Sequence, residues 1–281
     1  MQIITTKADL RLFLKSQYPK SIGFVPTMGA LHQGHLALVE RSKRENDLTV
    51  CSIFVNPIQF NKPEDLAKYP RTEEQDSLML REVGCDVLFM PSVDEFYPSQ
   101  VLTSINFGTI EQSMEGAFRP GHFSGVGVVL CKFFNLVKPQ KAYFGQKDFQ
   151  QCAVVRQLIV ELDFDIELVI CPTLREASGL AMSSRNKRLK PTQLENASKL
   201  YRALQTLAQV FRDGLPLKAS ISTIKNTLEQ DGIFEVEYIE FVDTHTLAPV
   251  GIKHDPARVV VCIAALIDGV RLIDNLLVEH E

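Results

Sequence analysis

The stretch "FVPTMGALHQGHLALVERSK", residues 24–43, predicts the type of fold. An apolar run ends at Pro26, a turn containing Gly29 follows, and a helical pattern starts near Gln33. A strand, a glycine turn and a helix in this order form the repeating unit of a parallel sheet. Glycine lets a ligand approach the main chain closely, and the helix directs its unpaired N–H groups at the turn. The stretch therefore predicts an α/β fold with an anion-binding turn.

The same alternation of apolar runs and helical patterns continues over the first 170 residues. Apolar runs at 22–26, 48–55, 86–91, 141–145 and 166–172 each end at a turn signal, and helical patterns lie near 33–46, 72–84, 123–137 and 149–162. Strands that are apolar throughout imply a parallel sheet covered on both faces. We predict a Rossmann-like domain over residues 1–174, with ligands at the carboxyl ends of its strands.

The pattern changes in the last third of the chain. Helices are predicted at 191–213 and 217–231, followed by the strands "FEVEYIEFVD", "RVVVCIAALI" and "VRLIDNLLVE". Asp268-Gly269 between the last two is a strong hairpin signal. We therefore predict a smaller α+β lid domain over 175–281, containing two helices and a three-stranded antiparallel sheet, with a hinge in the polar segment 172–191.

Composition excludes several classes of protein. The chain has 281 residues, 45% of them hydrophobic and 23% charged, with a net charge of −4, which is ordinary for a globular protein and gives no support for nucleic-acid binding. Charges at Lys7, Asp9 and Arg11 interrupt any signal-peptide core, and no apolar window is long enough to span a membrane. The six cysteines stand singly in mostly apolar runs, as unpaired thiols do in a reducing compartment, so we expect a cytoplasmic protein.

His32 and His35 admit three interpretations. Zinc needs three or four ligands, and the zincin pattern H-E-x-x-H fails because residue 33 is Gln. An ordinary pair of surface or core histidines would be the default elsewhere in a chain. Beside a glycine turn and a helix N-terminus, however, two imidazoles can donate hydrogen bonds to the oxygens of a polyphosphate.

Three more polar clusters follow predicted strands. Asn56, Gln59 and Asn61 follow the second strand, "YFGQKDFQQ" follows the fourth, and "GLAMSSRNKRL" follows the fifth. Polar residues in a turn usually only reverse the chain. Four phosphate-compatible clusters at the same edge of one sheet favour a ligand site.

Six segments, "PTMGALHQGH", "SIFVNPIQF", "YPRT", "FRPGHFSGV", "FGQKDFQQ" and "GLAMSSRN", occur in order between residues 26 and 186. Together they resemble the pantothenate synthetase (pantoate–β-alanine ligase) family. H-x-G-H alone is shared with a wider superfamily of nucleotidyltransferases and class I aminoacyl-tRNA synthetases. The resemblance implies ATP-dependent condensation of (R)-pantoate with β-alanine through a pantoyl-adenylate, with Mg²⁺, release of AMP and pyrophosphate, and a homodimer.

The resemblance also implies roles for matched positions. His35, with His32 and Lys147, would be catalytic; Gln59 and Gln151 would bind pantoate, and Gln59 also the β-alanine side. Asn56 and Arg119 would lie on the substrate side, and Asp76 near a metal. The positions matched to ATP binding are Met28, Gly29, Ala30, Leu31, His32, Gln33, Gly34, His35, Gly145, Gln146, Lys147, Asp148, Leu174, Met182, Ser183, Ser184 and Arg185.

Three positions depart from the family pattern. Gln146 stands where Glu is usual, Phe149 where Tyr is common and Ser178 where Asp is usual. Ser178 puts the hydrogen bonding of the hinge in doubt. Rival interpretations are another adenylyl-transferring enzyme, an aminoacyl-tRNA synthetase, for which no basic surface is present, and a nucleotide sensor without turnover.

Overall fold

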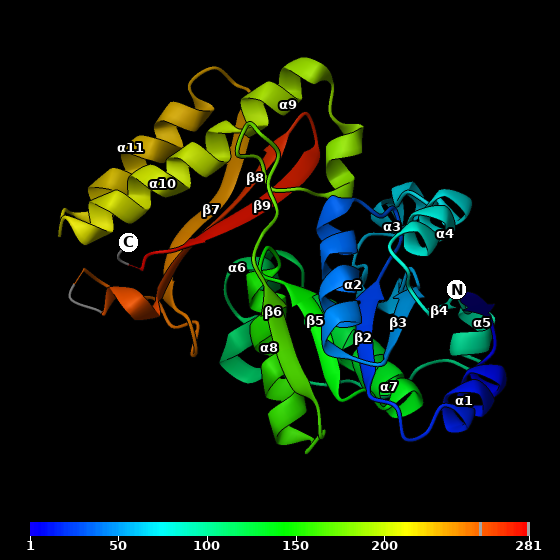
Figure 1. The fold of residues 1–281 in the computed structure, drawn as a ribbon. Coiled ribbons are helices and arrows are strands. Elements are labelled where there is room, and N and C mark those ends of the chain that lie inside the picture. Colours follow the sequence, from blue (N-terminus) through cyan, green and yellow to red (C-terminus); the bar gives the residue numbers. More distant parts are fainter. Residues whose placement is uncertain (253–254, 280–281) are drawn as a thin grey trace. The chain divides into compact units, whose positions relative to one another are not determined.

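The computed structural model describes residues 1–252 and 255–279, and the chain forms two compact units (Figure 1). The first unit contains Met1–Gln146 and Gln151–Pro172; the second contains Lys147–Gln150 and the chain from Thr173 onward. The division falls two residues before the predicted boundary at 174/175. The roles assigned to the two predicted domains, nucleotide and pantoate binding for the first and lid for the second, stay predictions.

The first unit is built on a parallel sheet, as the sequence predicts. Among the described residues this sheet has six strands in the order β1-β4-β3-β2-β5-β6. The strands are β1 (Gln2–Ile4), β2 (Ile22–Thr27), β3 (Leu48–Ile53), β4 (Val87–Phe89), β5 (Lys141–Gly145) and β6 (Glu167–Cys171). The five predicted strands are confirmed, and the three-residue β1 was not predicted because its apolar run is too short to stand out.

Helices cover both faces of this sheet. They are α1 (Lys7–Ser16), α2 (Gln33–Glu45), α3 (Pro63–Lys68), α4 (Glu73–Glu82), α5 (Val93–Phe96), α6 (Met114–Phe118), α7 (His122–Val137) and α8 (Phe149–Glu161), with 3₁₀ turns η1 (Pro57–Gln59) and η2 (Gly108–Glu111). Alternate residues of β2 enter different cores: Phe24 packs with Phe133 of α7, and Val25 belongs to the core that contains Val39 of α2. Burial on both faces explains why these strands are apolar throughout.

Helix α7 lies directly against η1, the turn that follows β3. A Cβ atom at Gly125 would lie 2.5 Å from the carbonyl oxygen of Ile58 and 2.7 Å from the Cα atom of Gln59. No side chain fits at this distance, so glycine is required for the close approach. The position of η1 is therefore set by a buried helix.

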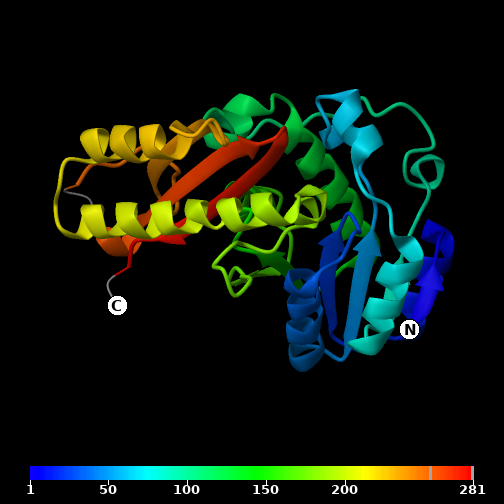
Figure 2. The ribbon, with the colours of Figure 1, turned by 90° about the horizontal axis from the view of Figure 1, so that it is seen from above.

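The second unit packs helices on an antiparallel sheet (Figure 2). Its elements are η3 (Ser184–Arg188), α9 (Pro191–Ala197), α10 (Lys199–Arg212), α11 (Leu217–Glu229), β7 (Phe234–Asp243), η4 (Pro256–Arg258), β8 (Val259–Ile267) and β9 (Val270–Leu277). Asp268 and Gly269 have φ values of 49° and 72°, the left-handed geometry of a two-residue hairpin, which confirms that prediction. The prediction of one helix over 191–213 is wrong. Ser198 ends α9 because its N–H and hydroxyl both donate to the carbonyl of Glu195 instead of continuing the helical ladder.

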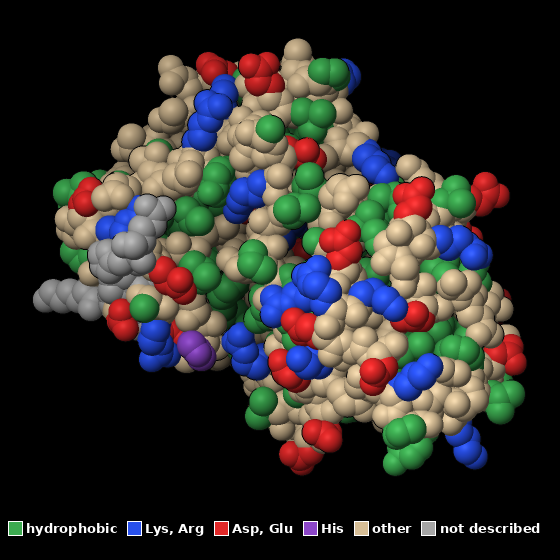
Figure 3. Space-filling view, in the orientation of Figure 1, with side chains coloured by type: hydrophobic (Ala, Val, Ile, Leu, Met, Phe, Trp, Pro, Cys, Tyr) green, Lys and Arg blue, Asp and Glu red, His purple; other side chains and the backbone are tan. Residues whose placement is uncertain are grey.

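The charged surface, the thiols and the helix lengths can be described directly from the structure. On the face shown in Figure 3, Lys and Arg side chains lie among Asp and Glu side chains. The six cysteines all fall within the described residues and form no disulfide, and Cys131 alone among them is only half-buried. Within residues 1–252 and 255–279, none of the helices is both long and apolar enough to cross a bilayer.

A buried ion pair fixes the start of the polar segment in the second unit. The Arg175 guanidinium donates to both carboxylate oxygens of Asp274, at 2.6 and 3.0 Å, and stacks 3.7 Å above the ring of Tyr201. Arg175 also donates to the carbonyl oxygen of Gly179. Burial raises the pKa of Asp274, and the Arg175 charge opposes that effect by favouring the ionised form. The pair thus ties residues 175–179 to strand β9 and helix α10.

Asp274→Asn should destabilise the protein strongly, because it leaves the partly buried Arg175 charge without its counter-ion. Breaking a buried pair in this way costs about 3 kcal/mol or more. Urea unfolding at pH 7 measures the change. The matched control is Lys225→Gln, which removes an exposed pair with Glu229 and should cost about 0.5 kcal/mol or less. Equal effects of the two substitutions would contradict a structural role for the Arg175–Asp274 pair.

Candidate functional site

The turn between β2 and α2 is held by one buried carboxylate. Gly29 and Ala30 have φ values of 80° and 51°, the left-handed region that alanine rarely adopts. The N–H groups of Ala30 and Leu31 each donate to one oxygen of Asp76, both at 2.8 Å. The hydroxyl of Thr72 donates to the same carboxylate at 3.1 Å. These bonds offset the cost of the strained turn, and Asp76 is only 1% exposed.

His32 and His35 lie side by side at the start of α2. His32 is the N-cap of the helix, and its Nδ1 atom accepts a hydrogen bond from the N–H of Gly34 at 3.2 Å. Because Nδ1 accepts, a neutral His32 carries its proton on Nε2. The two imidazole centroids are 4.0 Å apart. The turn therefore combines two imidazoles with the positive end of a helix, an arrangement suited to an anion.

A cavity of about 160 Å³ opens beside this turn, within the first unit. Met28, Gly29 and Asp76 line it together with residues that follow β3 and β4 and residues at the start of α4. Gln59 is not among the lining residues. The cavity thus reaches the predicted nucleotide turn from the side of α4.

Gln59 lies next to the same turn through the side chain of Met28. The Gln59 Nε2 atom donates to Met28 Sδ at 3.1 Å, and its Oε1 atom accepts from Asn56 Nδ2 at 3.1 Å. Asn56 Nδ2 also donates to the carbonyl of Gly125, and Asn56 Oδ1 accepts from the hydroxyl of Tyr97 at 2.8 Å. The amide of Asn56 thus has three protein partners. That Asn56 contacts substrate directly stays a prediction, and its contacts give it a second role as a support for Gln59.

The main chain of Gln59 has its own anchor. His122 Nδ1 lies 2.9 Å from the Gln59 carbonyl oxygen, and His122 Nε2 lies 3.1 Å from Arg119 Nη1. A carbonyl only accepts and a guanidinium only donates, so these contacts fit a neutral His122 protonated at Nδ1. Arg119 also pairs with Glu115 at 3.8 Å. The substrate-side role predicted for Arg119 remains a prediction; its observed partners belong to the support of η1.

The predicted residues after β5 divide between the two units. Gly145, Gln146 and Gln151 belong to the first unit, where the N–H of Gln146 donates to the carbonyl of Cys171 at 2.8 Å. Lys147 and Asp148 belong to the second unit. There the Lys147 ammonium lies 3.8 Å from the Asp148 carboxylate.

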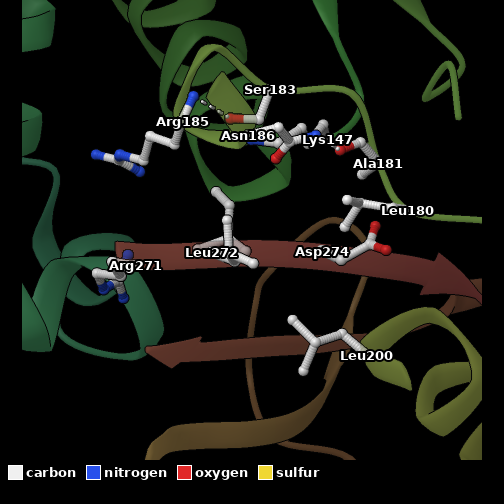
Figure 4. Close-up of a pocket in the computed structure, with 11 residues that line it drawn as sticks. Lys147, Leu180, Ala181, Ser183, Arg185, Asn186, Leu200, Arg271, Leu272 and Asp274 are labelled. Atoms are coloured by element: carbon white, nitrogen blue, oxygen red, sulfur yellow. Dashed lines mark hydrogen bonds between the residues drawn. The ribbon is translucent and has the colours of Figure 1, made fainter. Parts of the chain in front are cut away.

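In the second unit, basic and hydroxyl side chains surround a small pocket. Lys147, Ser183, Arg185 and Asn186 line it with residues of β9, including Asp274 (Figure 4). Its volume is about 10 Å³, close to that of one water probe. The carbonyl of Lys147 accepts from Asn275 Nδ2 at 2.9 Å, which fixes the main chain of this lysine. The two cations and the hydroxyl form a second candidate surface for phosphate oxygens.

The remaining predicted positions lie along the segment from Leu174 to Arg185. The N–H of Met182 donates to the carbonyl of Leu174 at 3.0 Å, so these two predicted ATP residues are neighbours. Ser183 caps η3 by accepting from the N–H of Arg185, and Ser184 is buried. Ser178 stands where the family pattern usually has Asp, and its hydroxyl accepts a hydrogen bond from the N–H of Leu180 at 3.4 Å. A carboxylate could accept the same bond, so the departure preserves this local contact.

Metal ligation by Asp76 stays a prediction that its contacts do not favour. Each of its oxygens already accepts a main-chain hydrogen bond. In the part of the chain that the structure describes, no three His, Cys, Asp or Glu side chains come together in a group that could hold a metal without other ligands. Mg²⁺ demands octahedral oxygen ligands. Proteins usually hold Mg²⁺ through one or two carboxylates together with waters and substrate phosphates, so a metal near Asp76 stays a prediction.

Two residues that hydrogen-bond to predicted site residues escaped the sequence analysis. Tyr97 lies in "EFYPSQ", where nothing local distinguishes its hydroxyl, and it meets Asn56 across 41 positions of chain. His122 lies inside the segment "FRPGHFSGV", and only the folded chain shows its contact with the carbonyl of Gln59. A hydrogen bond between distant segments leaves no periodic signal in a sequence.

Comparisons with known proteins agree over the whole chain. A sequence profile described as "Pantoate-beta-alanine ligase" matches residues 2–277. The chain is 50% identical over 278 residues to the pantothenate synthetase of Cytophaga hutchinsonii, covering 98% of both chains. It is similar to the crystal structure of the Thermus thermophilus pantothenate synthetase, with a TM-score of 0.92, 43% identity and full coverage of both chains. A pantoate-beta-alanine ligase from Francisella tularensis, complexed with "Beta-gamma ATP and Beta-alanine", gives a TM-score of 0.83 at 37% identity, covering 100% of this chain and 99% of that one.

Asp76→Asn should weaken the turn that carries both histidines. The amide would present N–H groups to the N–H of Ala30 or Leu31, leaving a buried donor without an acceptor at a cost of about 2 kcal/mol. Urea unfolding measures this loss, and isothermal titration with ATP measures the effect on the turn. Glu74→Gln, at an exposed position in the first turn of α4 that does not line the cavity, is the control and should leave both measurements close to wild type. A fully stable Asp76→Asn protein would show that the carboxylate does not hold the turn.

Proposed function

Since the chain belongs to the pantoate–β-alanine ligase family, we propose that it condenses (R)-pantoate with β-alanine at the expense of ATP. The reaction proceeds through a pantoyl-adenylate and releases AMP and pyrophosphate. A carboxylate is a poor electrophile for an amine at neutral pH. Adenylation gives the pantoate carboxyl a good leaving group, AMP, which the amine of β-alanine then displaces.

One contact carries the assignment of the site within the first unit. Gln59 Nε2 lies 3.1 Å from Met28 Sδ, so the candidate pantoate residue touches the candidate ATP segment. A thioether is a weak acceptor, and a hydroxyl or carboxylate oxygen of pantoate would accept this N–H more strongly. Pantoate bound to Gln59 would thus lie next to the turn assigned to the nucleotide, as attack on the α-phosphate requires.

Charge stabilisation comes from fixed donors. In the adenylation step negative charge builds on the α-phosphate and on the departing pyrophosphate. His32 offers Nε2–H, because its Nδ1 is engaged as the helix cap. His35, Lys147 and Arg185 complete the set that we assign to the triphosphate. No protein nucleophile takes part, so the buried cysteines have no role in the step.

Further assignments rest on the family membership. We expect Mg²⁺ to accompany ATP, neutralising phosphate charge, and we derive no step through a metal at Asp76. Gln151 is assigned to pantoate, Leu174 to the adenine side, and Met182 to the segment Met182–Arg185 that closes on the phosphates. A homodimer and a cytoplasmic location remain predictions, which gel filtration and cell fractionation can test.

His35→Ala and Lys147→Ala should each lower pantoyl-adenylate formation by about 10²–10³-fold, because each removes a donor to the charge that develops on the phosphates. The measurement is pantoate-dependent isotope exchange between ATP and pyrophosphate, which reports the reversible formation of the adenylate. Lys218→Ala, an exposed lysine of α11, serves as the control and should exchange at the wild-type rate. Wild-type exchange in the two variants would remove His35 and Lys147 from the mechanism.

Gln59→Ala and Gln151→Ala should raise the KM for pantoate by about tenfold or more while the KM for ATP changes little. Sites built to hydrogen-bond a substrate hydroxyl discriminate strongly on that contact. Steady-state kinetics with each substrate varied in turn give both constants. Equal increases in the two KM values would indicate a general disturbance of the site instead of pantoate binding.

A further inference from the structure

The orientation of the Gln59 amide decides what this residue can offer a substrate. Facing one way, the amide presents two N–H donors; facing the other way, it presents an acceptor. We propose that Tyr97 is a positioning residue that acts through Asn56 to hold the Gln59 amide with its N–H groups toward pantoate. The inference rests on the proposed function, in which Gln59 binds pantoate, and it adds the device that makes Gln59 a donor.

The orientation of Asn56 follows from a partner that can only accept. Asn56 Nδ2 lies 3.1 Å from the carbonyl oxygen of Gly125 in α7. Turning the Asn56 amide over would bring two oxygens together in a site that is 1% exposed. Gly125 is buried in α7, which packs directly against η1, so its carbonyl has little room to move. Asn56 therefore directs its nitrogen toward Gly125 and its oxygen away from it.

Tyr97 supplies the donor that the Asn56 oxygen then requires. The phenol hydroxyl lies 2.8 Å from Asn56 Oδ1, and Tyr97 is 9% exposed. Its ring packs against Phe54 and Phe96, with centroid distances of 5.8 and 5.1 Å, and Lys132 Nζ lies 5.3 Å from its centroid. Burial raises the pKa of Tyr97, so the hydroxyl stays protonated and donates. A rigid aromatic side chain thus completes the hydrogen bonding of Asn56.

Asn56 passes this orientation on to Gln59. The second N–H of Asn56 Nδ2 needs an acceptor, and Gln59 Oε1 lies 3.1 Å away. With its oxygen engaged, Gln59 can only turn its nitrogen outward, toward Met28 Sδ. His122 holds the Gln59 carbonyl independently, so the main chain does not follow if the side chain turns. The sequence of donors, Tyr97 to Asn56 to Gln59, sets one direction for the amide.

Without the Tyr97 hydroxyl, the oxygen of Asn56 is a buried acceptor with no donor. The free-energy cost of this unpaired acceptor favours rotation of the Asn56 side chain to a position where its oxygen finds a donor. That rotation would break the hydrogen bond from Asn56 Nδ2 to Gln59 Oε1. The Gln59 amide would then populate both orientations, and only one of them donates to pantoate. The expected consequence is weaker pantoate binding with ATP binding retained.

The test is Tyr97→Phe, which removes one oxygen atom and keeps the ring. The KM for pantoate should rise about tenfold while the KM for ATP stays within about twofold. Tyr143→Phe is the matched control. Its hydroxyl is also hydrogen-bonded, to Glu45 and Asn46, on a buried side chain at the opposite end of the sheet. That control should leave the pantoate KM unchanged, and an increase equal to that of Tyr97→Phe would overturn the proposal.

Two further variants separate this inference from the proposed function. In a Gln59→Ala background, adding Tyr97→Phe should not raise the pantoate KM further, because Tyr97 acts through Gln59. An additive effect, or an unchanged KM in Tyr97→Phe alone, overturns the inference while a raised KM in Gln59→Ala still supports the proposed function. If Gln59→Ala itself leaves the pantoate KM unchanged, the proposed function fails and this inference fails with it.

Gln59→Glu tests the orientation even if Tyr97→Phe does not fold. Asn56 would donate to one oxygen of the new carboxylate, and the other oxygen would face pantoate as an acceptor. The KM for pantoate should therefore rise at least as much as it does in Gln59→Ala. A Gln59→Glu enzyme with the wild-type pantoate KM would show that residue 59 presents an acceptor, and would overturn the proposal.

Discussion

The carboxylate of Asp76 holds together the part of the molecule on which the rest of the site depends. It accepts the N–H groups of Ala30 and Leu31 at the point where the chain leaves β2 in a left-handed conformation. A carboxylate forms stronger hydrogen bonds than a neutral acceptor, which suits a buried turn in which Ala30 has a strained, left-handed backbone. The turn determines where helix α2 starts, and the start of α2 determines where His32 and His35 lie. Asp76 of α4 thereby positions His32 and His35 at the start of α2.

A similar division of labour holds for Gln59. Its side chain is directed by Asn56 and Tyr97, its carbonyl by His122, and its distance from α7 by Gly125. Each of the three hydrogen bonds is buried and pairs a donor with an acceptor. A site whose polar groups are satisfied in only one arrangement is organised before substrate arrives, which lowers the cost of binding.

The sequence predicted what local pattern encodes: strands β2 to β6, helices α2 and α7, and the hairpin at Asp268-Gly269. The break at Ser198 was missed, because a serine that bonds to a carbonyl three residues back leaves the apolar period intact. The candidate site was harder to predict, because hydrogen bonds between residues far apart in the sequence hold it together. Asp76 was assigned to a metal by resemblance, yet it accepts main-chain N–H groups 45 and 46 positions away, and Tyr97 had no signal at all. Family motifs contain the residues that are expected to contact a ligand. The residues that orient those side chains can be identified only in the structure.

The close contact at Gly125 limits how the enzyme could be redesigned. The η1 turn packs on the backbone of α7 without a side chain between them at Gly125. The distance between η1 and α7 is therefore set by backbone contact. Substitution at position 125 cannot enlarge the space for a bulkier acid; it can only push η1 out of place. Engineering the enzyme to use a bulkier acid would therefore have to keep Gly125 unchanged. The substitutions would have to be made at other residues around the bound acid.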